Sequence, residues 1–249
     1  MTNPEADAQA IDEHALAVRV RRGHGERYDD FSVKRRAHQT VLDIVTEIQR
    51  EIDPTLAYRF ACRVGMCGSC AMTVNGVPRW TCRTRIDAIV EGNERLLLEP
   101  LRNLPVIKDL AVEMTPFFDK WTAAHGYFEP GEAPAKDFAI VPPSSPQRQA
   151  ADEGIECINC GICYAACDVV AWNSAYLGPA ALNRAWTLVN DRRDNGQEAR
   201  LAAVSAEDGC QSCHTHMNCT AFCPKHLQPT YAIAGLKGMA MRRALGRKA

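Results

Sequence analysis

The chain has 249 residues, which is enough for one large or two ordinary domains. Its composition, 46% hydrophobic and 24% charged, is typical of a globular protein. The net charge of −1 excludes the basic excess of a general nucleic-acid binder, and charged residues interrupt every apolar run before it reaches the length that crosses a bilayer.

Twelve cysteines are the unusual feature of the composition. The first 14 residues are acidic and polar, and they lack both the apolar core of a secretory signal and the Arg-rich, acid-poor character of a mitochondrial transit peptide. We therefore expect a bacterial cytoplasmic location. In such a reducing compartment, so many cysteines indicate metal or redox chemistry in place of a disulfide framework.

The first third of the chain predicts a mixed α/β domain. Residues 15–22 and 28–36 alternate apolar with polar side chains around a Gly-containing turn, which predicts a β-hairpin. Residues 40–53 place their apolar side chains on one helical face, with Thr40 as the N-cap. Pro54 then ends this helix.

A second hairpin follows in this domain. Residues 71–74 and 77–82 flank Asn75-Gly76, a strong signal for a tight hairpin turn. The apolar residues 96–98 predict a further buried strand. A hairpin, a helix and more strands in this order are compatible with a β-grasp sheet.

The remaining chain predicts a separate, all-helical domain. Residues 129–149 are rich in proline and polar side chains, as in a connector. Three Ala/Leu-rich helices are expected after it, and the basic C-terminal stretch suits a helix end, with contact to anionic lipid as the alternative. We predict an α+β protein with a first domain over residues 1–115, a connection over 116–150 and a helical domain over 151–249.

The first cysteine group has the spacing C-x4-C-x2-C, with a fourth cysteine twelve residues later: Cys62, Cys67, Cys70 and Cys82. This spacing is typical of plant-type [2Fe–2S] proteins. Gly65 and Gly68 allow the loop to fold tightly and its N–H groups to approach the sulfurs. A structural zinc site is the alternative, since zinc also takes four cysteines.

The second and third groups form a quasi-repeat. One is C-x2-C-x2-C-x3-C, at Cys157, Cys160, Cys163 and Cys167. The other has histidine in its second place, at Cys213, His216, Cys219 and Cys223. In paired motifs of this kind the last cysteine ligates the other cluster. This rule predicts a [4Fe–4S] site at Cys157, Cys160, Cys163 and Cys223, and a [3Fe–4S] site at Cys167, Cys213 and Cys219.

Two residues of the third group leave alternatives open. His216 could ligate a fourth iron and give a second [4Fe–4S] cluster, since imidazole is a competent iron ligand. It could instead remain unligated and tune a [3Fe–4S] cluster, or have no special role. Cys210 fits a small buried apolar residue, with a role as a substitute ligand as the minor alternative.

Five motifs together resemble one family. They are CRVGMCGSC…TC, CINCGICYAAC, WNSAYLGPAAL, DRRD and CHTHMNCTAFCPKHLQP, and the resemblance runs from about residue 16 to residue 238. The chain is similar to the iron–sulfur subunit of succinate dehydrogenase and fumarate reductase. The resemblance implies a helical domain like a two-cluster bacterial ferredoxin, placed after the β-grasp domain.

The resemblance also implies partners and a place in the cell. A flavoprotein subunit with FAD would interconvert succinate and fumarate, and this chain would have no dicarboxylate-binding site. Its [2Fe–2S], [4Fe–4S] and [3Fe–4S] clusters would carry electrons between FAD and quinone at membrane-anchor subunits. The chain would lie as a peripheral subunit on the cytoplasmic face of the bacterial inner membrane.

Four residues are implicated at the quinone end by the same resemblance. His214 and Trp172 match positions that lie near or contact quinone in the family; a backbone-bonding histidine and a core tryptophan are the alternatives. Asp168 stands where family members usually have proline, and His216 where they commonly have a non-ligating aliphatic residue. Some members also lack a cysteine at the position of Cys70.

Two other functions are alternatives to this electron-transfer role. The first is the iron–sulfur subunit of another flavin-dependent dehydrogenase or of a disulfide reductase with the same two-domain layout. The second is a zinc-stabilised binding module, which would be colourless and hold no acid-labile sulfide.

Overall fold

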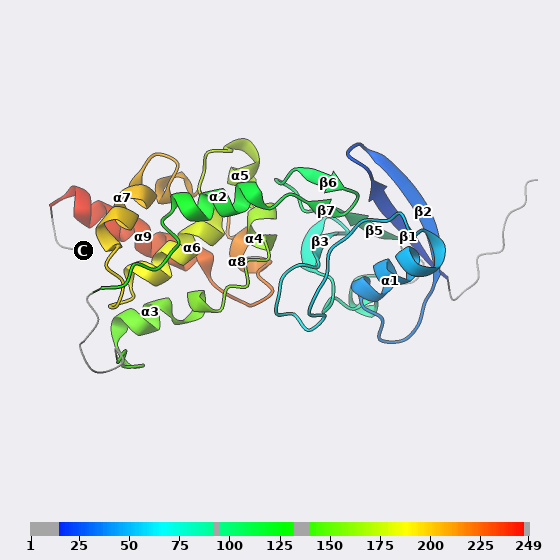
Figure 1. Cartoon of the computed structure of the whole chain (residues 1–249), viewed down its shortest axis with the longest axis horizontal. Coiled ribbons are helices and arrows are strands. Elements are labelled where there is room, and N and C mark those ends of the chain that lie inside the picture. The colour runs from blue at the N-terminus through cyan, green and yellow to red at the C-terminus, as the bar shows by residue number, and fades with distance from the viewer. Residues whose placement is uncertain (1–14, 92–94, 132–139, 247–249) are drawn as a thin grey trace, which may run out of the picture.

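The computed structural model describes residues 15–91, 95–131 and 140–246. The acidic stretch 1–14, on which the expected absence of a targeting signal depends, lies outside them, as does part of the predicted connector. The sheet domain and the helical domain lie side by side along the long axis of the molecule (Figure 1). Within the described ranges, no helix has the length and apolar character needed to cross a membrane.

The first domain is built on a mixed five-stranded sheet with the strand order β2-β1-β5-β3-β4. The strands are β1 (Ala15–Arg22), β2 (Arg27–Lys34), β3 (Ala71–Val74), β4 (Val77–Trp80) and β5 (Leu96–Glu99). β1 and β5 are parallel, whereas the other pairs are antiparallel. Both predicted hairpins and the predicted strand at 96–98 are therefore confirmed.

The predicted helix of the first domain is α1 (Val41–Glu47), which continues as a π-helical turn, η1 (Ile48–Ile52). Thr40 is its N-cap in a capping box: the Thr40 hydroxyl accepts from the N–H of Asp43, and the Asp43 carboxylate accepts from the N–H of Thr40. The apolar face of α1 packs on the sheet to form the core of the domain. Its most buried members include Val18, Val20, Ile44, Val45, Ile48, Leu96 and Leu98.

A short hairpin, β6 (Val106–Lys108) and β7 (Ala111–Val112), lies at the junction of the two domains (Figure 1). It leads into α2 (Thr115–Ala123), whose Phe117 is buried in the core of the helical domain. The predicted connection over 116–150 thus contains most of α2 and the start of α3 (Pro146–Ile155). The junction is a packed interface and not only a linker, since Leu101 and Val112 join the same core.

The second domain is helical, as predicted. After α3 it contains α4 (Ile162–Ala165), α5 (Asp168–Trp172), α6 (Gly178–Val189), α7 (Gln197–Ser205), η3 (Cys210–Ser212), α8 (Asn218–Ala221) and α9 (Pro229–Ala244). α6 is buried along almost its whole length and contacts α2, α3, α7 and α9. The short helices α4, α5 and α8 contain or adjoin cysteine motif positions; α4 contacts α6, and α8 contacts α4 and α9.

A buried arginine of α7, Arg200, ties this helix to the loop before it through an ion pair and to the loop after α2 through hydrogen bonds. Asp194 and Arg200 are fully buried, and Arg200 Nη1 donates to Asp194 Oδ1 at 2.6 Å. Arg200 also donates to the carbonyls of His125 and Tyr127 at 2.8 and 2.9 Å. Every part of this guanidinium is thus engaged, which is the condition under which burial of a charge is tolerated.

Candidate metal centres

The loop before β3 gathers the first two cysteines of the first group. Gly65 and Gly68 have left-handed φ values of +74° and +71°, which allow the loop to curl around one sulfur. Backbone N–H groups donate to the Sγ of Cys62 at 3.2–3.4 Å, from Val64, Met66 and Cys67. The Cys67 Sγ in turn accepts from the N–H of Cys62 at 3.4 Å. This ring of donors stabilises negative charge on sulfur.

Cys70 and Cys82 form the buried side of the same group. Both pack against Leu42. Burial raises the pKa of Cys82 to about 11, and the nearby Cys70 adds to this shift through its hydrogen bond and its charge. At Cys67 burial acts to raise the pKa, but hydrogen bonds from the Cys62 N–H and from Ser69 outweigh it and lower the pKa to about 6. The surroundings of Cys67 therefore favour its thiolate, the form that binds metal.

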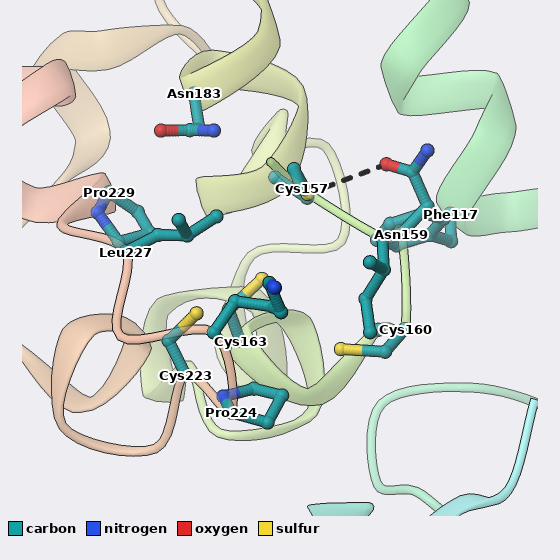
Figure 2. A pocket seen from close by; sticks show the side chains of 14 residues that line it. Phe117, Cys157, Asn159, Cys160, Cys163, Asn183, Cys223, Pro224, Leu227 and Pro229 are labelled. Atoms are coloured by element: carbon teal, nitrogen blue, oxygen red, sulfur yellow. Dashed lines mark hydrogen bonds between the residues drawn. The ribbon is translucent and has the colours of Figure 1, made fainter. Parts of the chain in front are cut away.

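Four cysteines line a pocket in the helical domain: Cys157, Cys160, Cys163 and Cys223. Figure 2 shows that Cys223 reaches this pocket from a part of the chain remote in sequence from the other three. Gly161 caps α4 with a left-handed φ of +76°, so the chain turns sharply between Cys160 and Cys163. The structure brings together the four residues that the crossover rule groups.

Burial makes three of these thiols, those of Cys157, Cys160 and Cys163, poor acids in the absence of a cation. It raises the pKa of Cys160 to about 12, and burial followed by the charges of Cys160 and Cys157 raises the pKa of Cys163 well above its ordinary value. A thiolate in such a pocket needs a neighbouring positive charge. The chemistry of the four thiols suits a cationic cluster, whereas in the described part of the chain no three His, Cys, Asp or Glu side chains converge to hold a single metal ion.

A second pocket of the helical domain is lined by Cys167, Cys213 and Cys219. Cys167 precedes α5, Cys213 follows η3 and Cys219 lies in α8. The N–H of Thr215 donates to Cys213 Sγ at 3.4 Å. Burial raises the pKa of Cys219 and also that of Cys167. These thiols also fit a cationic metal centre.

Two polar residues of this pocket were not predicted from the sequence. The Thr230 hydroxyl, at the start of α9, lies 3.3 Å from Cys219 Sγ. Tyr176 is buried, and burial, followed by the nearby charges of Cys213 and Cys167, raises the pKa of its hydroxyl. Tyr176 stands within the WNSAYLGPAAL motif, which is the one sequence signal that could have indicated it.

Cys210 lies apart from both pockets of the helical domain. It is fully buried in the hydrophobic core and is not among the residues that line either cysteine pocket. Its surroundings match the expected small apolar residue.

The four residues implicated at the quinone end lie together beside the third cysteine group. The Trp172 ring meets the rings of His214 and His216 edge to face, with centroids 5.7 and 5.9 Å apart. Trp172 is 63% exposed, so it is not the core tryptophan of the alternative interpretation. His214 and His216 also line the pocket of Cys167, Cys213 and Cys219.

Asp168 and His216 are in contact although 47 other residues separate them in the chain. His216 Nδ1 lies 3.5 Å from Asp168 Oδ2, which also accepts from the Asn218 side chain at 3.2 Å. The two side chains thus form one polar pair. The pair is partly exposed and adjoins the Trp172 ring.

Comparisons with known proteins match both domains. A model described as a 2Fe-2S iron-sulfur cluster binding domain matches residues 17–119, and one described as a 4Fe-4S dicluster domain matches residues 153–227. Among solved structures, the Mycobacterium smegmatis Sdh1 complex in the apo form contains a chain that superposes with a TM-score of 0.84 at 27% identity. The superposition covers 94% of this chain and 98% of that one.

Relatives of known name are similar over most of their length. The succinate dehydrogenase iron–sulfur subunit of Paracoccus denitrificans is 38% identical, over 89% of this chain and 84% of that subunit. The fumarate reductase iron–sulfur subunit of Escherichia coli O157:H7 is 35% identical, over 82% of each chain. The mitochondrial succinate dehydrogenase iron–sulfur subunit 1 of Oryza sativa is 36% identical, over 81% of this chain and 71% of that one. The chain therefore belongs to the family of iron–sulfur subunits of succinate dehydrogenase and fumarate reductase.

Proposed function

We propose that this chain relays electrons between the FAD of a flavoprotein subunit and a membrane quinone, as the iron–sulfur subunit of a succinate dehydrogenase or fumarate reductase. The proposal is carried by one observation: the three cysteine groups lie near one another in sequence order. The loop of the first group contacts Cys160 of the second, and Cys163 of the second interacts electrostatically with Cys219 of the third.

The proposed ligands follow the three groups. Cys62, Cys67, Cys70 and Cys82 would hold a [2Fe–2S] cluster; Cys157, Cys160, Cys163 and Cys223 a [4Fe–4S] cluster; Cys167, Cys213 and Cys219 a [3Fe–4S] cluster. The curled loop around Cys62 and the two cysteine-lined pockets support this assignment. When bound, the clusters supply one-electron redox chemistry, while the protein sets their spacing and surroundings.

In this proposal His216 does not ligate iron. Its Nδ1 faces the carboxylate of Asp168, its ring meets Trp172, and the side chain is 42% exposed. A ligand that replaced a buried cysteine would be expected to turn away from these partners and toward the sulfurs. The last cluster would then keep three irons.

The quinone would bind at Trp172, His214, Asp168 and His216. An exposed tryptophan has an indole N–H free to donate to a quinone oxygen, and two flanking imidazoles and a carboxylate provide further polar contacts. We further propose that membrane-anchor subunits cover this side, and that the chain lies on the cytoplasmic face of the bacterial inner membrane. The membership in the family supports both statements.

The test is a redox titration of the complex purified with this chain. EPR should detect a [2Fe–2S] centre, a [4Fe–4S] centre and, in air-oxidised protein, a near-isotropic [3Fe–4S] signal, and succinate should reduce the complex. A colourless preparation that contains only zinc would contradict the proposal. Iron–sulfur centres without a co-purifying succinate-oxidising flavoprotein would indicate another flavin-dependent enzyme instead.

A further inference from the structure

One close contact between the two domains joins a glycine of the first cysteine group, Gly68, to Cys160 of the second. Gly68 stands between Cys67 and Cys70, and a Cβ atom there would lie 2.7 Å from both Cα and Cβ of Cys160. It would also lie 3.2 Å from the Cys160 nitrogen. Cys160 is held by its own loop, so it could not move aside as the end of a flexible side chain could. Any larger residue at position 68 would separate the two loops.

The two loops face one another without an intervening element. Cys67, Gly68 and Ser69 of the first loop and Asn159 and Cys160 of the second line the same pocket at the domain junction. The contact at Gly68 therefore sets how near the first site comes to the second. If the two loops were farther apart here, the distance between the proposed clusters would also be larger.

A second contact holds the helical side of the junction in place. Asn103 has a left-handed φ of +64°, and its side-chain amide donates to the carbonyls of Tyr164, Ala165 and Cys167 at 3.0, 3.3 and 3.2 Å. These carbonyls lie at the C-terminal end of α4, the helix that carries Cys163. Asn103 thus caps α4 from the other domain, where helix carbonyls lack partners within the helix.

We propose that Gly68 and Asn103 are positioning residues that jointly fix the separation of the first and second clusters. Gly68 permits the two loops to touch, and Asn103 prevents α4 and its ligand from shifting away. The proposal rests on the proposed relay. In the step concerned one electron leaves the first site and one arrives at the second, and no bond or proton is transferred.

The first test is Gly68→Ala in the full chain, assembled with its partner subunits and with clusters inserted. We expect a weaker magnetic interaction between the two reduced centres in EPR and a several-fold slower electron transfer between them. The matched control is Gly76→Ala. Gly76 has a φ of +76° but no atom within 4 Å of the added Cβ, so it carries the same backbone strain without the clash. This control should leave the interaction and the rate unchanged.

The second test does not depend on how well Gly68→Ala folds. Asn103→Ala should weaken the same magnetic interaction and slow the same step. Its control is Asn75→Ala: Asn75 is also left-handed, at a φ of +48°, but its side chain bonds Leu97 and Ile89 within the first domain. Asn75→Ala should lower thermal stability without changing the interaction.

The outcomes separate this inference from the proposed function. If complexes of Gly68→Ala and Asn103→Ala with full cluster content keep the wild-type magnetic interaction and transfer rate, the inference is wrong. The same holds if the control variants change both quantities as much. A wild-type complex that lacks the clusters, or that succinate does not reduce, would instead contradict the proposed function.

Discussion

The contact between Asp168 and His216 bears on whether the histidine is an iron ligand. The sequence presents an aspartate after a cysteine and a histidine in a place where a cysteine ligand is expected. The structure places their side chains 3.5 Å apart, beside the exposed ring of Trp172. The histidine therefore has a partner outside the pocket of cysteines, which favours the interpretation in which it is not a ligand.

Replacement of His216 tests that interpretation directly. We expect His216→Ala to keep the [3Fe–4S] signal of the air-oxidised complex at its wild-type intensity, because the three thiolates are untouched. EPR of the purified complex is the measurement. Conversion of a second four-iron centre into a new three-iron signal would identify His216 as a ligand. Cys219→Ala serves as the positive control, since it should abolish the last cluster.

Replacement of Trp172 tests the quinone end. Trp172→Phe keeps an aromatic ring but removes the indole N–H, and we expect quinone reduction to fall by roughly tenfold, the value of about one hydrogen bond. Reduction of the clusters by succinate should not change. Stopped-flow reduction and steady-state quinone assays on one preparation separate the two. The control is Tyr127→Phe, at another exposed aromatic residue. An equal loss of quinone reduction in this variant would contradict the assignment of Trp172 to the quinone site.

Among the elements, the end of β1 depends on a buried carboxylate. Asp109 accepts from the N–H groups of Gly23 and Ala57 at 2.7 and 2.8 Å and from Arg22 Nε at 3.2 Å. Burial acts to raise the pKa of Asp109, but these donors outweigh it and the pKa is lowered. The carboxylate thus ties the hairpin β6–β7 to two other segments of the sheet domain.

This lowered pKa predicts an acid-dependent loss of stability. The folded state binds fewer protons at Asp109 than the unfolded chain does. The contribution of Asp109 to the free energy of unfolding is therefore complete above about pH 4, its pKa in the unfolded chain, and is lost as the pH falls through its folded pKa. Asp109→Asn should cost about 2 kcal/mol near pH 7 and show a weaker pH dependence below about 4. Thermal unfolding midpoints measured across this range check both; parallel curves for the two proteins would contradict the prediction.

The buried pair of Arg200 and Asp194 makes a prediction about the loop before α7. Asp194→Ala should destabilise the helical domain by about 3–5 kcal/mol, because it leaves a buried guanidinium without its partner. Arg193→Ala is the matched control: its pair with Asp191 is 46% exposed on the arginine side, so about 0–1 kcal/mol is expected. Denaturation of both variants gives the comparison. Similar losses of unfolding free energy in the two variants would mean that burial does not determine how much each ion pair contributes to stability.

For the molecule as a whole, the proposed relay requires that two independently built domains hold their sites at a fixed separation. The core of the helical domain extends into residues of the first domain, including Ala71, Leu101 and Val112. A continuous apolar interface resists the relative motion that separate domains otherwise show. Gly68, against Cys160, and Asn103, at the end of α4, add two specific contacts to this apolar interface.

Much of this protein could be predicted from local patterns. Asn75-Gly76 specified a hairpin, and Thr40 was correctly predicted as the N-cap of α1. The spacing of the cysteines grouped them into three sets, since the closely spaced members of each motif, such as Cys157, Cys160 and Cys163, lie on one short segment. The π-helical end of α1 and the helix inside the predicted connection were not predicted, because packing against neighbouring elements and not local propensity selects them.

The sequence by itself determined the family, the two-domain order and the cysteine groups, because turn chemistry, helix caps and ligand spacing act over a few residues. Only the tertiary structure decided which distant residues meet. Asp168 reaches His216, Gly68 meets Cys160 and Asn103 caps α4 across separations of more than 45 residues. These contacts depend on how the two domains and their loops pack, and no periodic or local signal in the chain records that arrangement.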